Sequence, residues 1–283
     1  MGFVTKPDGT TALSSATIAV LLYFARPLLR MQLALYKQDV RRAQFPEDDP
    51  EFVIPGPDPD RLLFIGDVAV AGYGVLHQRM TAVFQTARFI AHDRARGCWW
   101  TTIAATDLTA ARVARMPALD AANVDAVVIM LGVPDVLLAT SSATWAANLG
   151  RIVERIQDQA APNCRIVLAG IPPMGDFRPI PPLARKMLML QIHRLNRITH
   201  DIASQRSNTS FVPFPDWRVG EMYVQELFPG SCSMKCGRAF SPRRRYRQWA
   251  KAAGPHPKTS LPSSAAGGRD QQRGVGLSRS RFR

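Results

Sequence analysis

Five short apolar runs recur along residues 61–214, and they contain β-branched residues without strict alternation of polar and apolar positions. Runs of this kind are typical of strands that are buried on both faces of a sheet. They predict five strands, at Leu62–Ile65, Cys98–Ala104, Val124–Val133, Arg165–Ile171 and Ser210–Phe214.

Between these runs, apolar residues recur at three- and four-residue steps, which is the spacing of one helix face. Because predicted strands and helices alternate, we expect an α/β domain with a parallel sheet covered on both faces. Ligands bind such sheets beyond the carboxyl ends of the strands. The helical positions are Leu76, Met80, Val83, Ala87 and Ile90, then Leu149, Ile152, Ile156 and Ala160, then Leu188, Ile192, Leu195 and Ile202.

Changes in composition divide the chain into four segments. Residues 1–42 are an apolar and basic helical segment, and residues 43–60 are a linker rich in proline and acids. The α/β domain is predicted over 61–252, followed by a basic tail at 253–283 that lacks apolar periodicity and is predicted to be disordered.

The apolar run Ala16–Ala25 is half of the ~20 residues that span a bilayer. We interpret it as an amphipathic helix that lies on the domain or on a membrane surface. A cleaved signal and an anchor stay open as alternatives. The expected location is therefore cytoplasmic or membrane-associated.

The net charge of +14 is concentrated near the carboxyl terminus. Residues 238–283 carry +11 of it, which leaves +3 for residues 1–237. We interpret the basic cluster at 243–247 as a solvated helix face. Weak binding to an anionic surface stays open as a further role. No specific nucleic-acid partner is predicted.

The four cysteines are too few for a disulfide framework in a chain of this length. Cys232 and Cys236 are two potential metal ligands, but only His256 follows them nearby and no second pair completes four ligands. We therefore predict no metal and no cofactor.

Glycines and acids cluster where the predicted strands end. The first strand runs into FIGDVAVAGYGV (64–75), the third into LGVPDVL (131–137) and the fourth into LAGIPPMGDFRPIP (168–181). The glycine spacing in the first block is not the GxGxxG of dinucleotide-binding proteins. Glycines at these positions allow a tight turn and close approach of a ligand.

These blocks, in this order and at these intervals, resemble the SGNH or GDSL hydrolases, whose blocks read like FIGDS, LGVND and AGVPPM. The resemblance covers about residues 61–251, including Trp249-Ala250. It implies a flavodoxin-like three-layer α/β/α fold with a five-stranded parallel sheet. For intact members it implies hydrolysis of carboxylic or acyl esters by a serine nucleophile, so the implied ligand is a small ester or acyl compound.

The resemblance also implies that the catalytic positions are altered here. The serine position is Val68, which has no hydroxyl group, and the block-two glycine falls near Ala104, where a backbone N–H can survive. The block-three asparagine is Pro134, which removes the side-chain amide that the oxyanion hole uses and also removes the local backbone N–H. Asp67, Gly72 and Asp135 are the possible residual site residues.

The family's last block, DGxHPS, supplies the aspartate and the histidine. The corresponding stretch here, Cys236–Pro242, contains neither, and it follows the unfamiliar sequence FPGSCSMKCGRAF at 228–240. We hypothesise that the gene carries local frame shifts there or is a decayed copy. Resequencing for an intact DGxHP frame tests this hypothesis.

Asp67 and Asp135 follow neighbouring strands. They could act as a carboxylate pair in acid–base chemistry, but we favour a structural role in which each acid holds a loop. The sequence thus predicts an esterase-like protein with little or no hydrolytic activity. The alternatives are a non-catalytic module that retains an acyl or carbohydrate pocket, and an accessory protein that acts through its basic tail.

Overall fold

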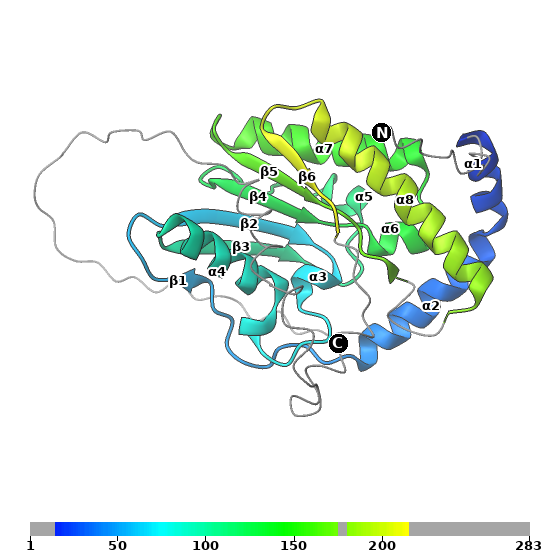
Figure 1. Ribbon diagram of the computed structural model, residues 1–283, viewed down its shortest axis with the longest axis horizontal. Coiled ribbons are helices and arrows are strands. Elements are labelled where there is room, and N and C mark those ends of the chain that lie inside the picture. Colours follow the sequence, from blue (N-terminus) through cyan, green and yellow to red (C-terminus); the bar gives the residue numbers. More distant parts are fainter. Residues whose placement is uncertain (1–14, 175–179, 215–283) are drawn as a thin grey trace, which may run out of the picture.

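The computed structural model describes residues 15–174 and 180–214, which form a six-stranded sheet with helices on both faces (Figure 1). The strand order is β1-β3-β2-β4-β5-β6, and β2 to β6 are parallel. Among the five parallel strands, the first lies between the second and the third, which is the flavodoxin-like order. The predicted fold class is confirmed. The strands are β1 (Val53–Ile54), β2 (Asp60–Gly66), β3 (Cys98–Ala104), β4 (Ala126–Met130), β5 (Arg165–Ala169) and β6 (Thr209–Val212).

The sixth strand, β1, was not predicted. It consists of two residues, and it pairs antiparallel with β3 through Val53 opposite Trp99 and Ile54 opposite Cys98. It lies within residues 43–60, the segment assigned to a linker. The same segment accepts a hydrogen bond at the Gln44 carbonyl from the Gly74 N–H. These residues therefore form part of the sheet edge and pack on the domain.

The helices cover the sheet in two layers. Alternate residues of the central strands face opposite sides, so that Leu63 and Ile65 join one apolar cluster with α7 and α8, and Leu62 and Phe64 join another with α4. Both faces are buried, as the apolar runs predicted. The helices are α1 (Ser15–Phe24), α2 (Arg26–Arg42), α3 (Val68–Ala71), α4 (Ala82–Arg94), α5 (Ala110–Val113), α6 (Val133–Leu137), α7 (Ser142–Gln159) and α8 (Pro182–Ser204), with a 3-10 turn at Gln78–Met80.

Helix boundaries follow local capping chemistry. The Ser141 hydroxyl accepts a hydrogen bond from the Thr144 N–H and so caps the amino end of α7. The helix predicted from Leu76 onward begins only at α4, because Thr81 caps it at the Phe84 N–H. Leu76 therefore lies outside the helix and is exposed.

Helix α2 lies on the surface of the domain and also contributes a buried side chain to its core. Its Leu29 is fully buried in the same cluster as α7 and α8, and α2 contacts both α6 and α8. Figure 1 shows α2 at the lower right of the molecule, next to one end of α8. Within the described residues, none of the helices has the length and apolar character required to cross a membrane.

Candidate functional site

The strand register brings three of the sequence blocks to one edge of the sheet. Gly66, the last residue of β2, is opposite Ala104 of β3 and Met130 of β4. β2 and β4 are the first and third parallel strands, so the order of the sheet reverses between them. This is the topological switch point at which α/β sheets bind ligands.

Asp67 joins the two central strands at this edge. Its side chain is buried, and Oδ2 accepts hydrogen bonds from the Gly132 N–H at 3.0 Å and the Val133 N–H at 2.9 Å. Its own N–H donates to the Met130 carbonyl at 3.1 Å. The carboxylate therefore fixes the loop after β4 to the end of β2.

Asp135 makes a separate connection to the neighbouring loop. It is also buried, with Oδ2 accepting from the Ala110 N–H at 3.0 Å and Oδ1 accepting from the Thr140 hydroxyl at 3.1 Å. The first contact secures the start of α5 and the second secures the segment between α6 and α7. Both acids thus hold loops, which is the role that the sequence analysis favoured over a catalytic pair.

Burial controls the ionisation of both acids. It raises the pKa of Asp67 to about 7, although the hydrogen bonds from backbone N–H groups oppose the rise and the Asp135 charge adds to it. Burial also raises the pKa of Asp135, against the hydrogen bonds from Ala110 and Thr140.

The raised pKa of Asp67 predicts that stability falls as pH increases. Unfolding lowers this pKa from about 7 to about 3.8, so between these values the folded state binds more protons than the unfolded state. The free energy of unfolding should fall by up to ~1.4 kcal/mol per pH unit in that window. Urea denaturation at a series of pH values measures the slope.

Asp67→Asn provides the control for this titration. The amide oxygen can still accept from the Gly132 and Val133 N–H groups, but the side chain no longer titrates. We expect a shallower slope in the variant. An identical slope in both proteins would show that other groups cause the pH dependence.

The residue that the sequence analysis assigned to the nucleophile position makes apolar contacts. Val68 is the first residue of α3, and its half-buried side chain packs against the cluster formed with α7 and α8. Ala104 is exposed at the end of β3, and the N–H of the next residue, Ala105, donates to the Gly66 carbonyl at 3.3 Å. The structure brings these two positions to the same edge, but neither offers a nucleophile.

Pro134 fits the local backbone. It occupies the first turn of α6, where a backbone N–H has no partner within the helix, and its side chain is buried. Proline is therefore compatible with the fold here, although it provides no amide for an oxyanion hole.

Gly72 ends α3 in the left-handed conformation at φ 79°, and Pro46 Cδ would lie 3.1 Å from an added Cβ.

Gly132 is a position at this edge where both the backbone and the space favour glycine. Its φ is 140°, and an added Cβ would lie 2.5 Å from Ile171 Cγ1. We expect Gly132→Ala to destabilise the protein by about 2 kcal/mol or more, because backbone strain and overlap add. The matched control is Gly150→Ala in α7, where an added Cβ meets nothing within 4 Å. Thermal unfolding should show a loss only for the first.

The sequence analysis missed one contributor to this edge, Tyr36. Its hydroxyl donates to the Thr106 carbonyl at 2.6 Å, which joins α2 to the loop after β3. Burial, with a smaller contribution from the charge of Asp67, raises its pKa. Leu22, Leu29, Gln32 and Tyr36 share the buried face of the helical unit, but the opposite face is equally apolar, so the sequence holds no signal that singles out Tyr36.

Several predicted features lie outside the described residues. These are the last block at Cys236–Pro242, the pair Cys232 and Cys236, His256 and the basic tail. In residues 15–174 and 180–214, three or more His, Cys, Asp or Glu side chains do not gather in an arrangement that could hold a metal ion.

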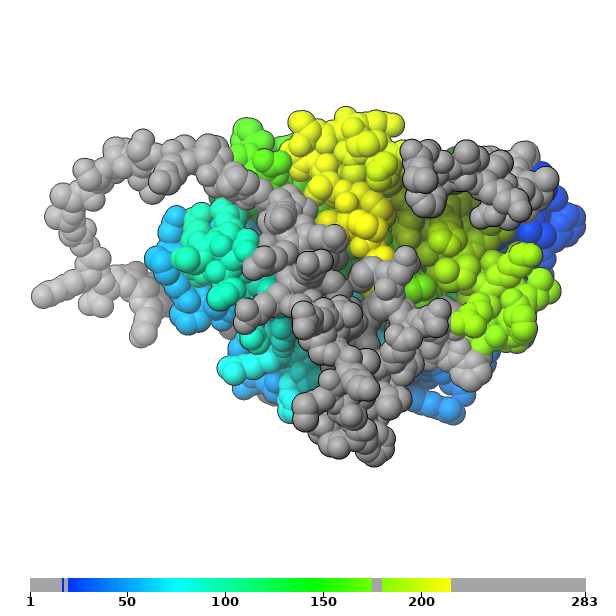
Figure 2. Space-filling model, in the orientation of Figure 1, coloured from blue at the N-terminus to red at the C-terminus, as the bar shows by residue number. Residues whose placement is uncertain are grey.

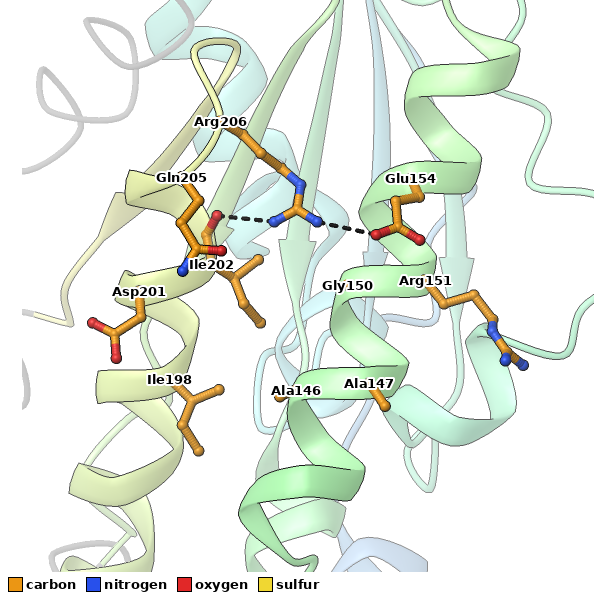
Figure 3. Close-up of a pocket in the computed structure, with 10 residues that line it drawn as sticks. All are labelled: Ala146, Ala147, Gly150, Arg151, Glu154, Ile198, Asp201, Ile202, Gln205 and Arg206. Atoms are coloured by element: carbon orange, nitrogen blue, oxygen red, sulfur yellow. Dashed lines mark hydrogen bonds and ion pairs between the residues drawn. The ribbon is translucent and has the colours of Figure 1, made fainter.

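A groove of about 470 Å³ lies between α7 and α8 (Figure 3). The Arg206 guanidinium crosses it and pairs with Glu154 at 3.2 Å, while Ile198 and Ile202 line the α8 side. Arg206 follows the end of α8 and precedes β6, so this part of the groove lies toward the amino ends of the strands. It is therefore separate from the edge that carries Asp67.

Comparison with known proteins identifies the family. The profile of the GDSL-like lipase/acylhydrolase family matches residues 64–257. The solved structure of TesA is similar at 20% identity over 68% of this chain and 95% of that one, with a TM-score of 0.44. AlinE4, an SGNH-hydrolase family esterase, has 17% identity, coverage of 70% and 94%, and a TM-score of 0.42.

The psychrotrophic esterase EstA from Pseudoalteromonas sp. has 18% identity, coverage of 68% and 93%, and a TM-score of 0.40. A search of curated proteins gave no significant match. The family profile covers well over half of the chain, from the end of β2 to beyond β6. The chain therefore belongs to the GDSL-like lipase/acylhydrolase family, for which ester hydrolysis is the family reaction.

Proposed function

We propose that this protein is a non-catalytic member of its family, with little or no ester hydrolysis by the serine mechanism. The observation that carries the proposal is Val68 in the nucleophile position, where its side chain packs against apolar neighbours. Loss of a nucleophile and a base together typically removes ~10⁶-fold in rate.

The surrounding groups support the same proposal. Pro134 replaces the asparagine of the oxyanion hole, and losing one such donor typically costs ~10²–10³ in rate. Asp67 and Asp135 already use their oxygens to hold loops. The edge thus keeps the scaffold of a hydrolase site without its reacting groups.

The alternative of an acyl or carbohydrate-binding module stays a prediction. The groove between α7 and α8 does not favour it, because that groove lies apart from the edge where the family binds its substrate.

Hydrolysis of short- and medium-chain p-nitrophenyl esters tests the proposal. The native chain is compared with a rebuilt protein that carries Val68→Ser, Pro134→Asn and the sequence DGFHPS within residues 236–242. We expect turnover from the rebuilt protein alone. Turnover by the native chain would contradict the proposal, and an inactive but folded rebuilt protein would contradict the assignment of the positions.

A further inference from the structure

Helices α1 and α2 are nearly continuous. Across their junction the Ala25 N–H donates to the Leu21 carbonyl and the Leu29 N–H donates to the Ala25 carbonyl, both at 3.0 Å. Pro27 lies in the first turn of α2, where it does not interrupt these bonds. The helical period of 3.6 residues therefore relates side chains on both sides of the junction.

This unit has an apolar stripe that faces away from the domain. The buried stripe contains Leu22, Leu29 and Gln32, with Ala25 and Tyr36 half-buried. Residues two positions apart on a helix lie about 200° apart, on nearly opposite sides. The positions opposite the buried stripe are Val20, Phe24, Pro27, Met31 and Leu35, and all five are exposed.

The exposure of this stripe is large for apolar side chains. Phe24 is 74% exposed, Val20 57% and Met31 48%. Figure 2 shows α1 at the right-hand edge of the molecule, where it forms part of the outline. A run of exposed apolar residues that follows one helix face indicates an interaction surface.

A basic row runs alongside the apolar stripe. Its members are Arg26, Arg30, Lys37 and Arg41, which recur at steps of four or seven residues and are all exposed. The Arg26 guanidinium also lies 4.7 Å from the centre of the exposed Tyr23 ring. With Arg42, residues 15–42 carry five basic side chains against one acid, Asp39.

We propose that the α1–α2 unit docks on an anionic phospholipid bilayer. The apolar stripe enters the boundary between headgroups and acyl chains, and the basic row contacts the lipid phosphates. Arginine and lysine can hold their charges at headgroup level while their stems cover apolar surface. A second copy of this chain fits the stripe less well. Its basic row would lie near the first one and repel it, since each copy has only one acid, Asp39, in this segment.

Co-sedimentation of the full chain with sucrose-loaded vesicles tests the proposal. We expect strong binding to vesicles of equal parts phosphatidylcholine and phosphatidylglycerol and much weaker binding to phosphatidylcholine alone. Because residues 238–283 carry +11, charge alone does not locate the contact. The double variant Phe24→Ser/Met31→Ser locates it, with an expected loss of about tenfold or more in partitioning.

Matched variants provide the controls. Leu76→Ser/Leu138→Ser removes two side chains of similar exposure on the body of the domain and should leave partitioning unchanged. Arg26→Gln/Arg30→Gln should weaken binding about tenfold, whereas Arg88→Gln/Arg151→Gln, also at exposed positions, should not.

Two results would overturn the proposal. One is native-like vesicle binding by the Phe24→Ser/Met31→Ser protein. The other is a dimer in size-exclusion chromatography that becomes monomeric in that variant, which would assign the stripe to a second copy of the chain.

Discussion

Asp60→Ala is expected to cost about 3–5 kcal/mol of the free energy of unfolding. Asp60 begins β2 with its side chain fully buried. Its two oxygens lie 3.2 Å from an Arg94 nitrogen and 3.3 Å from an Arg96 nitrogen. Removing the carboxylate leaves two largely buried guanidinium groups without this counter-charge at the edge where β2 and β3 begin.

Asp58→Asn is the matched control, because Asp58 also pairs with Arg96 but is 81% exposed. Asparagine tolerates the positive φ of 44° at this position, so the variant mainly removes charge. Solvent-exposed ion pairs contribute less than about 1 kcal/mol to the free energy of unfolding. Urea denaturation should separate the two variants clearly, and similar losses for both would contradict a special role for the buried carboxylate.

Leu29→Ala is expected to destabilise the protein by about 2–5 kcal/mol, since Leu29 is fully buried between α2 and the domain. Met31→Ala, two positions away on the exposed face, should change stability by less than about 0.5 kcal/mol. Chemical denaturation of the full chain measures both. A native-like Leu29→Ala protein would show that α2 does not belong to the cooperative unit.

The parallel sheet was predictable from the sequence because buried strands and amphipathic helices have different periods. β1 was not, since two residues within a proline-rich segment show no period at all. The packing of α2 was also hidden. Its buried stripe at Leu22 and Leu29 lies opposite an equally apolar exposed stripe, so the pattern alone does not tell which face meets the domain.

The candidate site was predictable in position but less so in its contacts. Because parallel strands end at one edge, the blocks at Asp67 and Asp135 were expected there. Their partners, the Gly132 and Ala110 N–H groups, lie at the starts of α6 and α5, whose positions are set by tertiary packing. Tyr36 reaches the edge from a helix 30 residues earlier in the chain, a proximity that sequence spacing does not encode.

Labelling with a fluorophosphonate tests the absence of a serine nucleophile most directly. Such reagents form a covalent bond with an activated serine, and intact-mass spectrometry detects the added phosphonyl group. We predict no adduct on the native chain under conditions that label the rebuilt protein at position 68. A stoichiometric adduct on any serine of the native chain would contradict the account.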